Sequence, residues 1–487
     1  MLVGIATTLG FELRYFRLEN QAFWWDELVT REYAHEKWAR LFGDLATVDV
    51  HPPLYYMLQK AWLVVGESRL AMRSLPAILG AACIPLIYLL GRRLGGNRVG
   101  IVAAFMLSSA PLHVILSREI RQYTLLSLFA LLAILSFAYL IPIGATVVGR
   151  AVSRRVWLGY VVGSAGAFYA HNTALVLPAL ASVVVMVLWL QGRVDRNLIR
   201  TWLVLNAAVL ALVLPWLWLS SYHLTHTLNN FWLPYPSLSW VKSQFLGAYP
   251  YPRLLKPVFM LIALFGVWSL RQNRLLLLFV LAFWIGEPLT FWLVSYVRPV
   301  LYCRPLVWST LLFPILAAIA LERLRTGPLI AATAALATLQ AVALLSDFPA
   351  NREQMGFEAL VPHLSDFTPD TDILVIGPQQ FDPELRVDAK QVDFRRNAIS
   401  IAYADLPEKV FEPLFAPRVP RAQLYDHVRG YRRVWLYTEI EPRFPVPPRD
   451  NFDQALRELE LHASSEQRWA SGDRVLMLFD IDTTPHG

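Results

Sequence analysis

The chain has 487 residues, of which 56% are hydrophobic and only 17% charged, and its formal net charge is +7. Soluble globular proteins carry about 25% charged residues, and stretches of 18 or more apolar residues are typical of membrane-spanning helices. The composition therefore excludes a soluble globular protein and predicts a polytopic membrane protein. Because the arginines gather in short loops between apolar stretches, the positive charge is explained by membrane orientation and not by nucleic-acid binding.

The apolar stretches predict about eleven spans, at residues 1–18, 72–90, 98–116, 123–142, 156–170, 173–190, 200–219, 257–270, 275–295, 305–321 and 328–346. The first stretch has no positive charge ahead of it, so no cleavable signal peptide is expected. Alternate loops are rich in arginine and are expected in the cytoplasm. The remaining loops should be periplasmic, namely 19–71, 117–122, 171–172, 220–256 and 296–304.

The tail after residue 346 has a different composition. Long apolar runs end, charges become dense, and short strand-like runs appear at 373–377, 433–437 and 474–479 with helix-like stretches between them. The predicted fold is therefore an α-helical membrane domain (1–346) followed by a soluble periplasmic α/β domain (347–487). The two cysteines, Cys83 and Cys303, imply neither a disulfide framework nor a CxxC metal pair.

Two adjacent acids open the first large outer loop. Asp26 and Glu27 follow three aromatic residues of the kind found at membrane–water interfaces. Neighbouring carboxylates repel each other unless they are solvated, paired or bound to a metal. The pair is interpreted as a general base with its helper or as ligands of a divalent metal (Mg, Mn or Zn), and the competing interpretation is a surface turn.

The same loop contains His51, Pro52 and Pro53, and the two prolines suit the first turn of a helix. Residues 54–66 then predict a short apolar helix lying in the interface. His51 is a candidate for substrate binding, and a purely structural histidine is the alternative.

Cations recur on the predicted outer face. Arg69 and Arg73 share a helix face, and Arg118, Glu119, Arg121 and Tyr123 occupy the next outer loop. A guanidinium group donates paired hydrogen bonds to phosphate, so these arginines are candidates for a phosphate site. The alternative is that they are anchors whose charged ends reach the interface.

Further polar residues lie at later outer turns, namely Tyr169, His171, Asn172, Arg298, Tyr302 and Arg304. Charge next to hydrocarbon is costly and by default indicates a functional site. Glu287 falls under the same rule inside a predicted span, where it would either serve a transport pathway or pair with a neighbour.

Together these motifs resemble the GT-C glycosyltransferases. The matching elements are Trp25-Asp26-Glu27, His51-Pro52-Pro53-Leu54-Tyr55, Arg69 and Arg73, and Ser117-x-Glu119-x-Arg121-x-Tyr123. They are closest to glycosyltransferase family 39 and its bacterial relatives, which include protein O-mannosyltransferases, the aminoarabinose transferase of lipid A and rhizobial galacturonosyltransferases. The resemblance covers about residues 10–325.

The resemblance implies transfer of a sugar from a polyprenyl-phosphate carrier to a lipid, glycan or protein acceptor at the periplasmic face of a bacterial inner membrane, with inversion. The carboxylate matching Asp26 would act on the acceptor hydroxyl, and Arg121 and Arg304 would hold the carrier phosphate. Many relatives have Arg-Tyr-Leu where this chain has Arg304-Pro305-Leu306, so the tyrosine of that motif has no counterpart here. The alternative function is a transporter or flippase for lipid-linked sugars.

Overall fold

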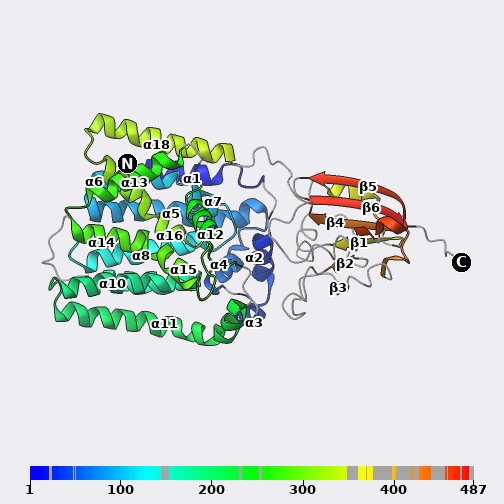
Figure 1. Cartoon of the computed structure of the whole chain (residues 1–487), viewed down its shortest axis with the longest axis horizontal. Coiled ribbons are helices and arrows are strands. Elements are labelled where there is room, and N and C mark those ends of the chain that lie inside the picture. The colour runs from blue at the N-terminus through cyan, green and yellow to red at the C-terminus, as the bar shows by residue number, and fades with distance from the viewer. Residues whose placement is uncertain are drawn as a thin grey trace. The chain divides into compact units, whose positions relative to one another are not determined.

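The computed structural model of the chain describes residues 1–20, 23, 25–47, 49, 51–143, 153–229, 233–251, 255–347, 360–368, 370–376, 398–401, 418–419, 427–439, 456–457, 459–471 and 474–481. It divides into two compact units, one formed by Met1–Leu18 and Tyr33–Phe348 and the other by Glu19–Glu32 and Pro349–Gly487. The first is helical and is called the helical unit below, and the second contains a β-sheet (Figure 1).

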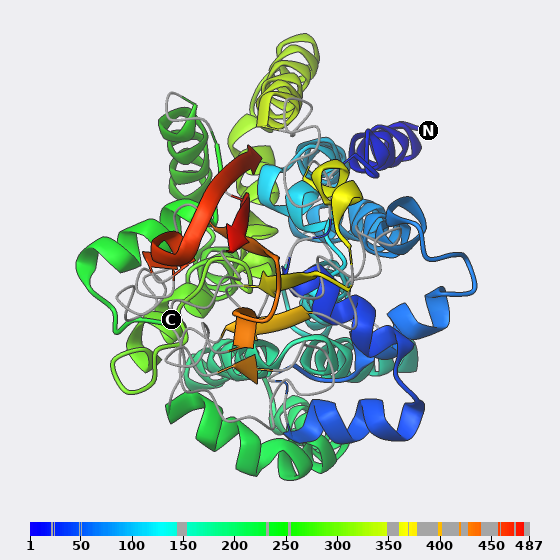
Figure 2. The ribbon, with the colours of Figure 1, turned by 90° about the vertical axis from the view of Figure 1, so that its right-hand side faces the viewer.

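The helices up to the middle of the chain are α1 (Leu2–Tyr15), α2 (Trp25–His35), α3 (Trp38–Thr47), α4 (Leu54–Trp62), α5 (Arg69–Gly95), α6 (Asn97–Ser108), α7 (Pro111–Leu116), α8 (Tyr123–Leu140), α9 (Arg154–Ala170), the 3₁₀ turn η1 (Asn172–Leu175) and α10 (Val176–Leu190). They continue as α11 (Arg196–Asn229), α12 (Leu238–Gly247), α13 (Lys256–Ser269), α14 (Arg274–Trp284), α15 (Gly286–Val294), α16 (Val307–Thr310), α17 (Leu312–Leu321) and α18 (Thr326–Asp347). Figure 2 views the long helices nearly end-on, with α11 and α18 at opposite edges of the helical unit.

Each of the eleven expected spans coincides with a helix or with a pair of helices. Within the described residues, five helical segments are long and apolar enough to cross a bilayer unaided: α5, α8, η1 with α10, α11 and α18. A sixth is the pair α14 and α15, which bends by 45° between its halves. Other expected spans are shorter or interrupted, as where Pro111 begins α7 after a break from α6.

Small residues allow the central helices to approach closely. Gly163 of α9 lies against the backbone of α8, where an added Cβ would come within 2.5 Å of the backbone nitrogen of Ala133. In helical membrane proteins such small residues bring helices together, because lipid gives apolar side chains little reason to associate. The helices α5, α6, α8 and α9 thus form a tightly packed centre that carries the outer turns considered below.

The C-terminal region contains the predicted α/β architecture. Its strands are β1 (Asp372–Ile376), β2 (Ala398–Ile401), β3 (Arg418–Val419), β4 (Arg433–Glu439), β5 (Ala463–Ser471) and β6 (Arg474–Ile481), preceded by the 3₁₀ helix η4 (Val361–Asp366). The sheet order is β3-β2-β1-β4-β6-β5. β1 to β4 pair in parallel, whereas β6 is antiparallel to β4 and β5, as in the register Leu436↔Met477. The expected strands at 373–377, 433–437 and 474–479 are confirmed as β1, β4 and β6.

One face of this sheet packs against a hydrophobic core that includes Val375, Leu436 and Phe479. At the start of β1 the buried Asp372 accepts hydrogen bonds from Arg433 Nε (3.0 Å) and from Trp435 Nε1 (3.0 Å). Because both donors come from β4, this carboxylate fastens the two central parallel strands to each other.

Candidate active site

Three segments far apart in the sequence meet in one polar cluster of the helical unit. They are the loop leading into α4, the turn between α7 and α8, and the junction of α9 with η1. We call Asp49, His51, Tyr56, Arg121 and His171 the polar cluster. Of these, His51, Arg121 and His171 were predicted site residues, whereas Asp49 and Tyr56 were not.

Asp49 is the acceptor at the centre of the cluster. Its Oδ1 accepts from the backbone N–H of His51 (2.9 Å) and lies 2.8 Å from His51 Nδ1. Its Oδ2 accepts from the Tyr56 hydroxyl at 2.8 Å. The Asp49 and His51 side chains are only 10% and 18% exposed, so their ion-pair geometry is protected from solvent.

Arg121 completes the cluster from the turn before α8. Its Nη1 lies 3.4 Å from the Tyr56 hydroxyl and its Nη2 lies 3.4 Å from His51 Nε2. The ring centroids of His51 and His171 are 5.3 Å apart, and that of Tyr123, the first residue of α8, lies 6.0 Å from His171. The predicted residues His51, Arg121, Tyr123 and His171 are therefore neighbours in space.

The ionisation of the cluster follows from its contacts. Burial raises the pKa of the Asp49 carboxyl, but His51 and Arg121 outweigh that effect and hold this pKa well below its usual range. Burial, reinforced by the Asp49 charge, raises the pKa of Tyr56 well above its usual value. Burial, together with His51 and Arg121, lowers the pKa of His171 well below its usual value. At neutral pH the cluster thus contains an aspartate anion, a guanidinium cation, a neutral tyrosine and a neutral His171.

The turn that carries Arg121 is fastened to α1 by two other arginines. Arg14 is fully buried in α1 and donates to the carbonyls of Gly10 (2.7 Å) and Ser108 (3.0 Å), and its Nε donates to Ser117 Oγ (3.1 Å). Arg118 donates to the carbonyls of residues at the end of the same helix, Arg14 (2.9 Å) and Phe16 (2.7 Å). The backbone bonds of Arg118 fit a fastening role better than the phosphate role expected of it, and its burial lowers its pKa to about 10.

Arg304 reaches the same turn from the chain before α16. Its Nη1 donates to Glu119 Oε2 at 3.0 Å, with both side chains about one-fifth exposed. Glu119 is two residues before Arg121, so Arg304 is linked to the segment that carries Arg121. The two arginines expected at the phosphate are thus connected through one turn of the chain.

Other predicted cations have different surroundings. Arg73 is buried in α5 and donates to the carbonyl of Leu18 at 3.1 Å. Arg69 is the partly exposed first residue of α5, and Arg298 is exposed after α15. A backbone carbonyl satisfies the buried Arg73, as P-side chemistry alone would not require, and this bond fits a structural role.

The acidic pair lies in the first turn of α2, and its segment belongs to the second unit. Asp26 is partly exposed, whereas Glu27 is buried. Successive residues on an α-helix point about 100° apart, so the two side chains do not converge on one atom. Of the two, Asp26 is the accessible carboxylate. Among the described residues no group of three or more His, Cys, Asp and Glu side chains has the arrangement of a metal site.

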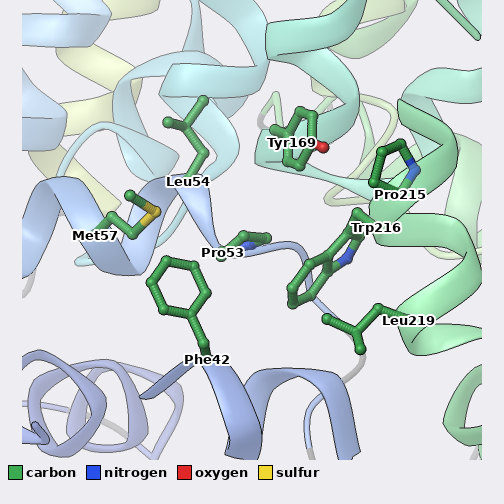
Figure 3. A pocket seen from close by; sticks show the side chains of 8 residues that line it. All are labelled: Phe42, Pro53, Leu54, Met57, Tyr169, Pro215, Trp216 and Leu219. Atoms are coloured by element: carbon green, nitrogen blue, oxygen red, sulfur yellow. The ribbon is translucent and has the colours of Figure 1, made fainter. Parts of the chain in front are cut away.

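An apolar cavity of about 290 Å³ lies in the helical unit. Figure 3 shows its lining side chains facing one common space: Phe42, Pro53, Leu54, Met57, Tyr169, Pro215, Trp216 and Leu219. Two of the lining residues are chain neighbours of the polar cluster, since Pro53 follows His51 by two positions and Tyr169 precedes His171 by two. The same two segments therefore contribute both to the cavity and to the charged cluster.

Comparisons with known proteins agree with this architecture. Residues 50–219 match the family described as dolichyl-phosphate-mannose-protein mannosyltransferase. No curated protein matches the chain by sequence.

Solved structures are similar over much of the chain. ArnT from Cupriavidus metallidurans in the apo state is 15% identical with a TM-score of 0.66, over 98% of this chain and 97% of that one. ArnT bound to undecaprenyl phosphate is 16% identical with a TM-score of 0.66, over 99% and 98%. The Archaeoglobus fulgidus oligosaccharyltransferase in complex with Zn and sulfate is 13% identical with a TM-score of 0.55, over 90% and 68%.

The family match includes the His51-Pro52-Pro53 segment, the turn with Glu119 and Arg121, and His171, which are the segments that build the polar cluster. The structural similarity extends the shared fold over the rest of the chain. Together they identify this chain as a multi-pass membrane glycosyltransferase of the GT-C superfamily.

Proposed function

We propose that this glycosyltransferase moves a sugar from a polyprenyl-phosphate carrier to a lipid, glycan or protein acceptor at the outer face of a bacterial inner membrane. The observation that carries the proposal is the junction of the polar cluster with the apolar cavity at residues 51–53 and 169–171. A lipid-linked phosphate needs a cation beside an apolar surface, and this junction offers both. The relative that binds undecaprenyl phosphate shares the fold.

The donor would place its phosphate at Arg121 and the first part of its hydrocarbon chain in the cavity. A volume of about 290 Å³ is at the lower end of ligand pockets, so it accommodates part of a long chain and leaves the rest to the bilayer. His51, Tyr123, His171 and Arg304 would surround the headgroup or secure the turn that holds it.

In the reaction the acceptor oxygen attacks the anomeric carbon from the face opposite the phosphate, which inverts that centre. The bond from this carbon to the phosphate oxygen breaks, and its electron pair stays on the phosphate. The Asp26 carboxylate takes the proton of the acceptor hydroxyl. The guanidinium of Arg121 stabilises the charge that grows on the leaving phosphate. Glu27 would assist Asp26 from the same helical turn.

A divalent cation (Mg²⁺, Mn²⁺ or Zn²⁺) at the acidic pair is a separate proposal. Because the two carboxylates diverge along α2, an ion there would take one of them and complete its shell with other ligands. Incubation with EDTA followed by removal of the chelator tests this. Loss of transfer that one of these ions restores would support a metal, and unchanged transfer would exclude it.

The direct test is transfer of labelled sugar in proteoliposomes that contain the purified protein, a polyprenyl-phosphate sugar and extracted envelope lipids. We expect transfer by the wild type, none by Asp26→Asn, and a raised KM for the donor with Arg121→Ala. Near-normal turnover by Asp26→Asn would remove Asp26 from the mechanism. Glycolipid profiles of a deletion strain would identify the sugar and the acceptor.

A second function, movement of the lipid-linked sugar across the membrane, is favoured by one feature. Glu287 is fully buried at the start of α15, beside the 45° bend between α14 and α15, and bent helices with buried acids are typical of transporters. The same vesicles separate the two functions. A transferase makes a new glycosidic bond, whereas a flippase changes only the side on which the labelled donor lies.

A further inference from the structure

Asp49 is absent from the motifs that the sequence singled out, yet it makes more contacts to His51 than any other described residue does. It accepts from the His51 backbone N–H at 2.9 Å and holds the ring by Nδ1 at 2.8 Å. Two bonds to one carboxylate oxygen fix both the chain direction and the ring plane of His51. A carboxylate at Nδ1 requires a proton on that nitrogen.

The opposite nitrogen of the ring faces a cation. Arg121 Nη2 lies 3.4 Å from His51 Nε2, and a guanidinium group can only donate. Nε2 must then present its lone pair, so the ring is neutral with its single proton on Nδ1. The arrangement of Asp49 and Arg121 thus determines the tautomer of His51 when no anion is bound.

Charged groups near His51 come from two elements. Asp49 lies in its own loop and Arg121 in the turn before α8. The other titratable neighbours are the hydroxyls of Tyr56 in α4 and Tyr33 in α2, whose pKa values are raised by burial and by Asp49, and His171, whose pKa is lowered by burial. These three are neutral near pH 7, so one anion and one cation govern the charge of His51.

An anion arriving at Arg121 changes this balance. The guanidinium turns its donors to the phosphate, and Nε2 then faces negative charge on one side while Nδ1 remains bonded to Asp49. Two flanking anions favour the imidazolium form, which donates from both nitrogens.

We propose that Asp49 is a positioning residue of the donor site, which orients His51 so that its Nε2 takes up one proton and donates it in a hydrogen bond to the carrier phosphate as that phosphate binds. The inference rests on the proposed function and deepens it. It makes phosphate binding a proton-coupled step in which His51 joins Arg121 as a second cation, and Asp49 acts through His51 without touching the donor.

The experiment is calorimetric titration of the purified full-length protein with the methyl phosphodiester of undecaprenol. This probe carries one negative charge that does not titrate near neutral pH, so any proton taken up belongs to the protein. Measurement in two buffers of different ionisation enthalpy gives the number of protons bound per probe. The dissociation constant is then followed from pH 6 to pH 8.

For the wild type we expect uptake of about one proton and an affinity that falls by as much as about tenfold per pH unit as histidine loses its proton. Asp49→Asn removes the anion and should abolish both the uptake and the pH dependence, with binding about tenfold weaker at pH 6. His51→Gln, which keeps Arg121, should behave in the same way. Asp49→Glu should restore part of the uptake.

The matched control is Asp44→Asn. It makes the same change five residues earlier, at a carboxylate that pairs with Arg40 at 3.6 Å. It should take up as many protons as the wild type. Uptake near zero in the wild type, or equal uptake in Asp49→Asn and the wild type, would overturn the proposal while leaving the proposed function standing. Absence of probe binding by the wild type would instead defeat the proposed function and this inference with it.

Discussion

Two regions on either side of one short turn use buried arginines in opposite ways. At the end of α1, Arg14 and Arg118 donate mainly to backbone carbonyls. In the polar cluster, Arg121 lies against two side chains, Tyr56 and His51, at 3.4 Å. The turn between α7 and α8 thus has one side fastened to the fold and one side directed at groups that can rearrange.

The difference teaches how partners decide the role of a cation. A buried carbonyl that loses its donor keeps the full cost of lost hydration, so an arginine bound to carbonyls stays where it is. Side-chain hydroxyl and imidazole groups can turn and find new partners when an anion arrives. Long contacts of 3.4 Å also give up less when they break.

The largest effect should come from the fastened side. Arg14→Met removes the donor of several buried acceptors and should destabilise the helical unit by about 3 kcal/mol or more. Thermal unfolding in detergent would show this as a large loss of melting temperature. Arg92→Met, at an exposed position of α5, is the control and should change it little. Equal melting temperatures for Arg14→Met and the wild type would contradict a fastening role.

The next effect separates Arg121 from Arg118 within one turn. Arg121→Lys keeps the charge but loses the forked donor set, and should lower kcat/KM by about 10² or more. Its melting temperature should stay close to that of the wild type. Arg118→Lys should do the reverse and lower stability more than turnover, because its partners are carbonyls of α1. If both variants lost turnover alike, the contrast between the two sides would fail.

A smaller effect is expected at the link between Arg304 and the turn. Glu119→Gln removes the charge that pairs with Arg304 at 3.0 Å. Since both groups are partly exposed, the loss should be about 1 kcal/mol, which raises KM for the donor by several fold. Glu36→Gln removes an acid that pairs with Arg40 at 3.6 Å and should leave this KM unchanged. An unaltered KM in Glu119→Gln would show that Arg304 secures nothing at the donor site.

The smallest effect tests an arginine paired with a carboxylate in the sheet unit. Burial raises the pKa of Asp372, but bonds from Arg433, Thr368, Trp435 and Thr371 outweigh it and lower the pKa overall. A lowered pKa contributes stability that is present above about pH 4 and lost as the pH falls further. Asp372→Asn should therefore cost about 1 kcal/mol at pH 7 and almost nothing at pH 3.

Hydrogen exchange of β1 and β4 in the full-length protein, corrected for intrinsic rates, would measure this difference. Protection of β1 that is equal in the variant and the wild type at pH 7 would mean that Asp372 contributes no stability through β4.

Much of the architecture followed from local pattern. Apolar runs indicated the helices, because hydrophobic length is a property of consecutive residues. β-rich runs likewise located β1, β4 and β6. The interruption at Pro111 and the bend at α15 were not expected, since a continuous apolar run looks the same whether the helix is straight or broken.

The sequence by itself determined that this protein is a helical membrane protein with an α/β tail, and it singled out His51, Arg121 and His171. Only the tertiary structure decided which arginines are fastened and which face the site, and it alone brought Asp49 into the cluster. A single carboxylate in a loop carries no periodic signal. The physical reason is that helices and strands arise from neighbours along the chain, whereas charge, burial and hydrogen-bond partners come from residues such as Asp49 and Arg121 that meet only in space.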